Sequence, residues 1–317
     1  MADNQSNVET LEKRKPGRPR KHDPKVTQKD TPIGLNFDKT IVTTKTFAAK
    51  VDNFDPLIKD WYEMINQSTE NKAGTVVEKY LKRDRSISVF KNCFHVVLLD
   101  MNLKKTTVKV CKNGAFHLTG CKSLEACEYC IVSLITGLWS NNTLKKTIPS
   151  VLKMSIKPVM TNVKFTIGFQ ISIEKSLDFF NNGTIIAQKE INGRTIEIRN
   201  KIHNFLAYRL TRSPALNIKK VLEHETLKQV PITKITFSGQ DGSNPCLGDR
   251  KTETVSVFDD IASLNKEGRD KFTKTRYTTF LLFRSGMVIL SGMHEAVMKD
   301  VFEEFQTVSL LYQRKIS

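Results

Sequence analysis

The stretches TTVKVCKNGAFHLTG, at residues 106–120, and TTFLLFRSGMVILSG, at residues 278–292, decide the fold. They align without gaps at an offset of 172 residues and share two threonines, the turn glycine, one leucine and the final glycine. Each reads as two strand-like runs joined by a turn that ends in glycine, which predicts a β-hairpin. The chain therefore carries the same hairpin twice, and this internal repeat is the best guide to its architecture.

A helix-like pattern follows each hairpin. Apolar residues recur there every three or four positions, as they do along one face of an α-helix. These residues are Leu124, Cys127, Ile131 and Leu134 after the first hairpin, and Val297, Val301, Phe305 and Val308 after the second. Each repeat is thus expected to end in an amphipathic helix.

Strand-like runs also precede each hairpin. They cover 40–51 and 93–101 in the first half, and 162–173 and 252–258 in the second half. The second half is longer, with a further hairpin expected around Asn192-Gly193 and a helical stretch near PALNIKKVLEHETL. We predict a tail over 1–31, a first repeat over 32–145, and a second repeat over 146–317 with an insertion at about 184–250.

Charge points to a polyanionic partner. The 317 residues include 50 Lys and Arg against 33 Asp and Glu, a formal net charge of +17. Cations that neutralise phosphates release condensed counterions, which favours nucleic acid as the partner. The six cysteines suit a reducing compartment better than a disulfide scaffold. We expect no membrane span, because no apolar run nears the required ~18 residues, and no secretory signal at the polar N-terminus.

The repeated strand–turn–strand–helix unit, with its TT…G…TG hairpin, resembles the TATA-box-binding protein (TBP) family. The resemblance is strongest over 93–135 and 277–317 and weaker over 36–62 and 154–175. It implies an α+β fold in which two repeats form a saddle-shaped, curved antiparallel sheet with helices on its convex side. The loose match with long insertions is closer to the divergent forms of large DNA viruses than to cellular TBP.

Alternation assigns the side chains of each hairpin to two faces. In the first hairpin an apolar set is expected to pack on the helices and a mixed set to face DNA. The apolar set is Val108, Val110, Phe116 and Leu118, and the mixed set is Lys109, Cys111, His117 and Thr119. In the second hairpin one face holds Phe280, Leu282, Val288 and Leu290, and the other holds Leu281, Phe283, Ile289 and Ser291.

Both faces of the second hairpin are therefore apolar, although an antiparallel sheet usually keeps one polar face. The second apolar face needs either a covering helix, a subunit interface, or a role as the floor of a DNA minor groove. By resemblance to TBP, Phe283 is a wedge between base steps, and Cys111 stands at the matching place in the first repeat.

The resemblance assigns further DNA-contacting residues. It places the other first-repeat wedge at Phe94, and its second-repeat partner at Phe258 or Phe272. Family members also read minor-groove acceptors with an asparagine near the centre of each repeat. Asn162 is expected to do so in the second half, whereas the first half offers Asn36 or no asparagine.

The N-terminal tail contains KRKPGRPRK at residues 13–21, which resembles an AT-hook. Prolines hold the backbone extended, and the arginines suit the narrow, negative minor groove of A·T tracts. The residues assigned to this hook are Arg14, Lys15, Gly17, Arg18, Pro19, Arg20 and Lys21. The alternatives are an ordinary basic tail or a nuclear-localisation signal, and a localisation role is compatible with the hook.

Nothing in the chain predicts an enzyme. Cys127 and Cys130 form a CxxC on a predicted helix, with no second such pair, so core cysteines are favoured over a metal site. No phosphate-binding loop, nucleophile elbow or carboxylate pair is found. We expect neither a metal, a cofactor nor a small-molecule substrate.

The sequence thus predicts a transcription-initiation factor that docks on A·T-rich double-stranded DNA through the minor groove. Its helical face is expected to meet a general transcription factor and RNA polymerase. The alternatives are an architectural protein of A·T-rich DNA and a TBP-like module of a nucleic-acid-processing complex. The expected location is the nucleus, or, for a viral protein, a cytoplasmic replication compartment or the virion.

Overall fold

The computed structural model describes the residues that form a folded α+β core. They are 36–54, 58–80, 93–141, 145–146, 148–191, 194–201, 205–209, 214–222, 224–239, 243–262, 264–268, 276–311 and 313–317. All of them belong to the compact unit Thr31–Ser317. Among them no helix is long and apolar enough to cross a membrane.

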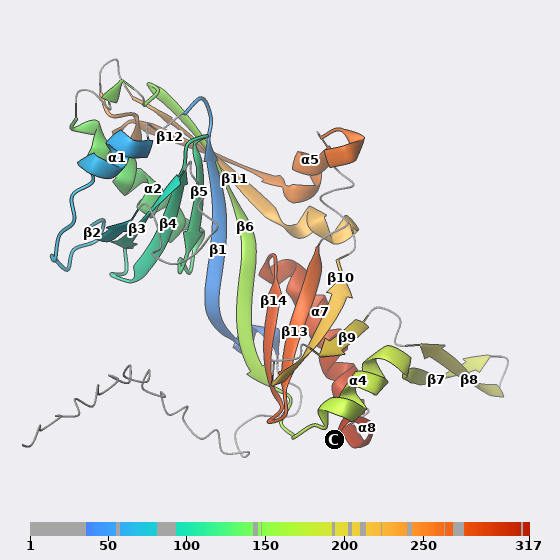
Figure 1. Ribbon diagram of the computed structural model, residues 1–317. Coiled ribbons are helices and arrows are strands. Elements are labelled where there is room, and N and C mark those ends of the chain that lie inside the picture. The colour runs from blue at the N-terminus through green and yellow to red at the C-terminus, as the bar shows by residue number, and fades with distance from the viewer. Residues whose placement is uncertain are drawn as a thin grey trace, which may run out of the picture. The chain divides into compact units, whose positions relative to one another are not determined.

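A curved antiparallel sheet forms the centre of this unit (Figure 1). Its main path runs in the order β2-β3-β4-β5-β1-β6-β14-β13-β10-β9. The first-half strands are β1 (Ile41–Val51), β2 (Val76–Tyr80), β3 (Cys93–Leu99), β4 (Lys105–Cys111) and β5 (Ala115–Thr119). The second-half strands are β6 (Val151–Thr166), β9 (Phe205–Arg209), β10 (Ala215–Val221), β13 (Tyr277–Phe283) and β14 (Met287–Gly292). Both predicted hairpins are confirmed, as β4–β5 and β13–β14.

Strands β1 and β6 are the long central pair on which the two halves meet (Figure 1). Their register shifts between Val42 and Thr44 and again between Thr46 and Phe47. Beyond each such irregularity the alternation of side chains is offset by one residue. The two offsets keep buried residues of both halves on one side of the sheet, so a single face continues across the centre.

Helices cover that side. They are α1 (Ile58–Met64), α2 (Leu124–Trp139), α4 (Ile173–Asn182), α5 (Val257–Ala262), α7 (Glu295–Leu311) and α8 (Gln313–Ile316), with short 3-10 turns at η1 (Phe37–Lys39), η2 (His224–Gln229) and η3 (Pro245–Leu247). The buried face of α2 packs on the first-half sheet, and α4 and α7 pack on the second. The predicted inward residues of both hairpins are buried in these two cores, which confirms the assignment of faces.

The repeated turn glycine has a steric cause. Gly114 and Gly286 both have a positive φ, of 73° and 79°. A Cβ at Gly114 would lie 2.4 Å from the Phe54 carbonyl oxygen, and one at Gly286 would lie 2.0 Å from that of Phe169. Each hairpin tip is thus pressed against a neighbouring loop, where only glycine fits.

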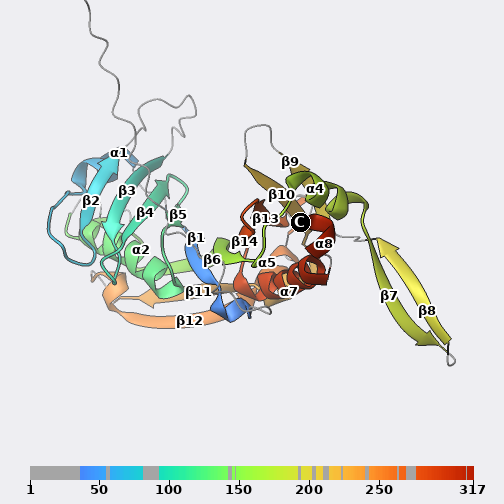
Figure 2. The ribbon, with the colours of Figure 1, turned by 90° about the horizontal axis from the view of Figure 1, so that it is seen from below.

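The second half is interrupted twice, which corrects the prediction of one insertion over about 184–250. Strands β9 and β10 lie inside that range and pair in the main sheet, whereas β7 (Thr184–Ile191) and β8 (Arg194–Lys201) form a separate ribbon (Figures 1 and 2). The stretch expected to be helical, PALNIKKVLEHETL, begins with strand β10, because Leu216 and Ile218 alternate with polar residues. The run 252–258 belongs to the second inserted ribbon and not to the main path.

That second ribbon ties the two halves together. It consists of β11 (Pro231–Ser238) and β12 (Asp249–Ser256), and β11 pairs with the first half of β6. From its end, Arg250 makes a bidentate ion pair with Glu128 of α2 at 2.6 and 2.8 Å. Asn244 donates to Thr136 of the same helix at 3.2 Å. A segment of the second half therefore braces the helix of the first.

Candidate nucleic-acid interface

The side of the main sheet opposite α2 and α7, here called the open face, carries two rows of mostly polar side chains. In register across the first half lie Tyr80, His95, Lys109, His117, Ala48 and Lys157. Across the second half and centre lie Lys219, Thr279, Ser291, Asn162 and Thr44. These side chains are half-buried or exposed, so the face is accessible where the structure describes it.

The strands themselves are strongly cationic. Within the described bounds of the ten strands on the main path, lysine and arginine hold eleven positions, and Glu78 is the only acidic residue. Lys109, Lys157 and Lys164 lie on the open face near its centre. Acidic residues instead gather on the helix side, where α7 alone carries Glu295, Asp300, Glu303 and Glu304. A polyanion would therefore approach the open face.

The predicted mixed set of the first hairpin is brought together on this face. Lys109 and His117 are cross-strand neighbours, as are Thr107 and Thr119. Partial burial lowers the pKa of the His117 imidazole below its usual range, and Lys109 and Lys157 lower it further. Burial raises the pKa of the Cys111 thiol, so this side chain is a neutral thiol at physiological pH.

The predicted apolar set of the second hairpin also lies on the open face. Leu281 pairs with Ile289, and Leu281, Phe283 and Ile289 are all half-buried. No described helix packs over them, which removes the covering helix as their explanation within the described residues. An accessible apolar strip beside lysines is the arrangement expected of a groove floor.

At the centre of the open face, Asn162 and Thr44 face each other across the β1–β6 pair. The Asn162 Nδ2 donates to Thr44 Oγ1 at 2.7 Å. Ser291 is the neighbour of Asn162 on its other side. The alternative Asn36 is wrong, because its side chain caps η1 through the amide of Asp38. Thr44 occupies the place across from Asn162, and no sequence pattern marked it.

Two wedge assignments are corrected. Phe94 points into the core, where it is fully buried and packs edge-on against Tyr62. Strand register shows why: Phe94 pairs with Val110, whereas Cys93 pairs with Cys111 on the open face. The resemblance to TBP that assigned Phe94 was thus one residue out of register on β3.

Of the two candidates for the second-repeat partner of Phe283, Phe258 is also wrong. The cross-strand neighbour of Phe283 on β10 is Ala215. Phe258 lies in α5, where Lys228 sits 4.8 Å over its ring, and Phe272 lies outside the described residues. Phe283 is therefore the only phenylalanine that the described strands bring to the open face.

Sequence reasoning missed an aromatic group at the outer end of this face. Lys219 Nζ lies 5.1 Å from the ring centre of Tyr208 and 5.0 Å from that of Tyr277. Asn217 sits on the same face of β10, one cross-strand step from Tyr208. The period-two alternation of ALNIKKV could have revealed this strand, but the segment was assigned to the insertion.

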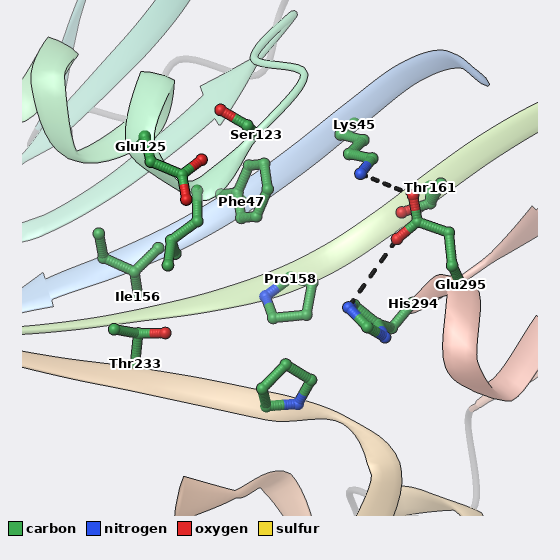
Figure 3. Close-up of a pocket in the computed structure, with 12 residues that line it drawn as sticks. Lys45, Phe47, Ser123, Glu125, Ile156, Pro158, Thr161, Thr233, His294 and Glu295 are labelled. Carbon is green, nitrogen blue, oxygen red and sulfur yellow. Dashed lines mark ion pairs between the residues drawn. The ribbon is translucent and has the colours of Figure 1, made fainter. Parts of the chain in front are cut away.

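A pocket of about 230 Å³ lies on the helix side, between the diverging strands β11 and β14 (Figure 3). Lys45 of β1 reaches Glu295 at the start of α7, with Nζ and Oε1 2.6 Å apart. His294 Nε2 lies 3.8 Å from the same carboxylate, and His294 Nδ1 accepts from the Ala296 amide at 3.2 Å. This pocket is lined by core side chains and a brace between halves, away from the open face.

The CxxC cysteines are core residues. Cys127 and Cys130 lie on the buried face of α2, and Cys121 precedes that helix; all three are fully buried. Hydrogen bonds from Cys127 and Cys130 lower the pKa of Cys121 to about 4. Among the described residues no group of histidine, cysteine and carboxylate side chains has the geometry to hold a metal ion. The residues of the predicted AT-hook, 13–21, lie outside the described residues.

The chain was compared with known proteins. No family model matches it. It is 44% identical over 327 residues to "Uncharacterized protein 335L" of Invertebrate iridescent virus 6, a match that spans 95% of this chain and 92% of the viral protein. Among solved structures it matches the TBP of Methanococcus jannaschii with a TM-score of 0.41 and 12% identity, over 85% of this chain and 97% of that chain.

Proposed function

The chain belongs to the family of the iridescent-virus protein 335L, and we propose that it is a DNA-binding protein built as two TBP-like repeats. Moving outward from β1–β6, both halves of the sheet present the hairpin strands in the same order, followed by two further antiparallel strands. This symmetric order supports the two-repeat arrangement and a saddle with helices on the convex side.

The charge of the strands is the observation that carries the proposal. Within its described strands, the main path carries eleven cations against one carboxylate. Three of the cations, Lys45, Arg209 and Lys220, pair with glutamates of helices on the other side. The open face carries Lys109, Lys157 and Lys164. Because α7 places four acids on the helix side, the open face is the side better suited to phosphates. We assign the open face to duplex DNA.

The apolar strip supports the minor groove as the site of contact. Leu281, Phe283 and Ile289 lie flat on the face beside Lys164, which pairs with Ile289. Apolar side chains press on sugars and open base steps in the minor groove, and phosphates flank them. Steps rich in A·T deform at low cost, so A·T-rich DNA is the proposed target.

We assign the protein's role in DNA binding to transcription initiation. The acidic helix α7 and the helix α2 are left on the side away from DNA, where a general transcription factor and RNA polymerase can dock. The AT-hook of residues 13–21 raises the local concentration of the sheet on A·T-rich DNA. An architectural role would need the same DNA face but no promoter preference.

Base substitution in the duplex tests the groove. Matched duplexes carry A·T, G·C or inosine·cytosine pairs, and affinity is measured by fluorescence anisotropy at fixed salt. Inosine·cytosine presents the minor groove of A·T but the major groove of G·C. We expect it to bind like A·T; binding no better than G·C would exclude the minor groove.

Lysine variants test the face. The triple variant Lys109→Gln, Lys157→Gln, Lys164→Gln is compared with a control triple of exposed lysines away from the open face. The control is Lys228→Gln, Lys251→Gln, Lys299→Gln. The slope of log K against log salt is negative, and each lost phosphate contact reduces its magnitude by about 0.9. A loss of slope in the first triple alone supports the open face, and an equal loss in both contradicts it.

A further inference from the structure

The outer end of the open face holds a group of side chains that lies outside the proposed minor-groove contacts of Leu281, Phe283 and Ile289. Tyr208 of β9, Lys219 of β10 and Tyr277 of β13 come from three adjacent strands and meet through the Lys219 ammonium. Tyr277 is 42% exposed. Its cross-strand neighbour Val221 is 59% exposed, and Leu206, the neighbour of Lys219 on β9, is 60% exposed. Two phenol rings and a cation are thus presented at the sheet edge.

An amide completes the group. Asn217 lies between Tyr208 and Leu281 in the strand register. Its Oδ1 is buried and has no hydrogen-bond partner among the described residues. A buried amide oxygen without a partner is unfavourable unless a ligand supplies a donor. The group therefore combines a stacking surface, a phosphate-binding cation and an unsatisfied hydrogen-bonding group.

We propose that this group, Tyr208, Asn217, Lys219 and Tyr277, binds an unpaired nucleotide of single-stranded DNA. A base stacks on a tyrosine ring, its edge meets the Asn217 amide, and its phosphate takes the Lys219 ammonium. Stacking of a base on an aromatic ring outweighs an exposed cation–π contact, so Lys219 is released from the rings at little cost. The inference rests on the proposed function in one respect: both place DNA on the open face.

Several features favour a nucleotide over a protein segment. The four residues lie on strands whose described residues carry no acid, which suits an anion. Paired bases hide their faces inside the duplex and cannot stack on Tyr277. Three of the four residues also lie outward of the apolar strip, on β10 and β9, where a strand released from an opened duplex would run, and Tyr277 lies on β13 beside them.

Four DNA probes separate the sources of binding. They are a blunt A·T-rich duplex, the same duplex with a three-nucleotide thymidine overhang, the same overhang built from abasic sugars, and a thymidine 12-mer alone. All are measured on the full chain by fluorescence anisotropy. The abasic overhang keeps the phosphates and removes the bases. We expect the thymidine overhang to tighten binding about tenfold, and the abasic overhang to give at most a twofold gain.

Matched variants locate the effect. The gain is taken for each variant as the ratio of its affinity for the thymidine overhang to its affinity for the blunt duplex. Tyr277→Leu and Tyr208→Leu are expected to bring this ratio close to one, and Tyr277→Phe is expected to keep it near ten. Tyr129→Leu, on helix α2, is the control and is expected to leave the ratio unchanged. Thermal unfolding followed by circular dichroism verifies that each variant is folded.

The outcomes distinguish this inference from the proposed function. If the blunt duplex binds but the thymidine overhang adds nothing, or if the abasic overhang adds as much, the nucleotide site is refuted. If the gain survives both tyrosine-to-leucine changes, the site is placed wrongly. If no duplex binds while the thymidine 12-mer binds in a Tyr277-dependent manner, the duplex proposal fails and this one stands.

Discussion

Asn162 donates a hydrogen bond to Thr44 Oγ1 at 2.7 Å, across the pair of strands on which the two halves of the sheet meet. The Asn162 Oδ1 is buried and has no partner among the described residues. The centre of the open face therefore holds an amide that is half satisfied in the free protein. Rotation of this amide would offer Nδ2 to an acceptor at the floor of a minor groove.

Replacing Asn162 by alanine is expected to weaken binding to an A·T-rich duplex about fivefold, the equivalent of one hydrogen bond of about 1 kcal/mol. Thr44→Val keeps the shape of that side chain and removes only the acceptor of the internal bond, so it should leave affinity within twofold. Anisotropy titrations with both variants check this. Unchanged affinity in a folded Asn162→Ala protein would remove Asn162 from the interface.

Phe283→Ala and Phe94→Ala should distinguish a residue that contacts DNA from a residue that stabilises the core. Phe94 is fully buried, and its truncation is expected to cost about 3–5 kcal/mol of unfolding free energy. Phe283→Ala should cost much less stability and instead reduce DNA bending, measured by energy transfer between dyes at the duplex ends. Urea denaturation supplies the stability. If Phe283→Ala left both bending and affinity intact, the wedge assignment would be refuted.

DNA affinity should rise as the pH falls from about 7.5 to 5.5. The lowered pKa of His117 leaves the imidazole neutral at pH 7, and protonation then adds a positive charge to the open face. Up to one proton is taken up on binding, and His117→Gln should flatten the dependence. Stability moves the other way: the unfolded chain binds the proton more tightly, so stability is lost as the pH falls below about 6.5. Parallel titrations of binding and unfolding check both signs.

The brace between Arg250 and Glu128 should be modest in energy. The Arg250 side chain is 47% exposed and that of Glu128 is 14% exposed, so solvent screens the pair. A double-mutant cycle with Arg250→Ala and Glu128→Ala is expected to give a coupling of about 1 kcal/mol by urea denaturation. A coupling near zero would show that this ion pair does not help to hold the ribbon β11–β12 against α2.

Deleting residues 1–31 tests the AT-hook. The segment supplies the cluster KRKPGRPRK, so its loss should lower affinity and the salt slope together on A·T-rich duplexes. Bending by the sheet should persist, since it depends on Phe283. The matched variant Arg18→Ala in the full chain is expected to reproduce most of the loss in affinity. Equal losses on A·T and G·C duplexes would reduce the hook to an ordinary basic tail.

The sequence predicted the hairpins and their faces because period-two alternation and turn glycines are local signals. Val108, Val110 and Phe116 were assigned to the core, and all three are fully buried. The outer strands of the second half were not found. Strand β10 lies between two inserted ribbons, so its pairing partner β13 is distant in sequence. Local sequence patterns do not predict which distant strand a given strand pairs with, or in which register.

The site was predicted less completely than the fold. The open face does carry Lys109, His117, Asn162 and Phe283. The assignment of Phe94 to that face is wrong by one residue of strand register. In a strand one residue of slip moves a side chain to the other face, so an alignment error of that size reverses its role. Residues such as Thr44 and Lys219 can be assigned to the site only once strand pairing shows which residues lie beside them.

The two halves of the open face are unlike, so the proposed complex with DNA would have one preferred orientation. One end offers lysine, histidine and threonine, and the other offers Leu281, Phe283 and Ile289. Two identical halves would seat equally well after a half-turn of the duplex, whereas these two would not. In the proposed role, a protein that binds its site in one orientation presents its helix side in one direction, which is the polarity that transcription initiation would need.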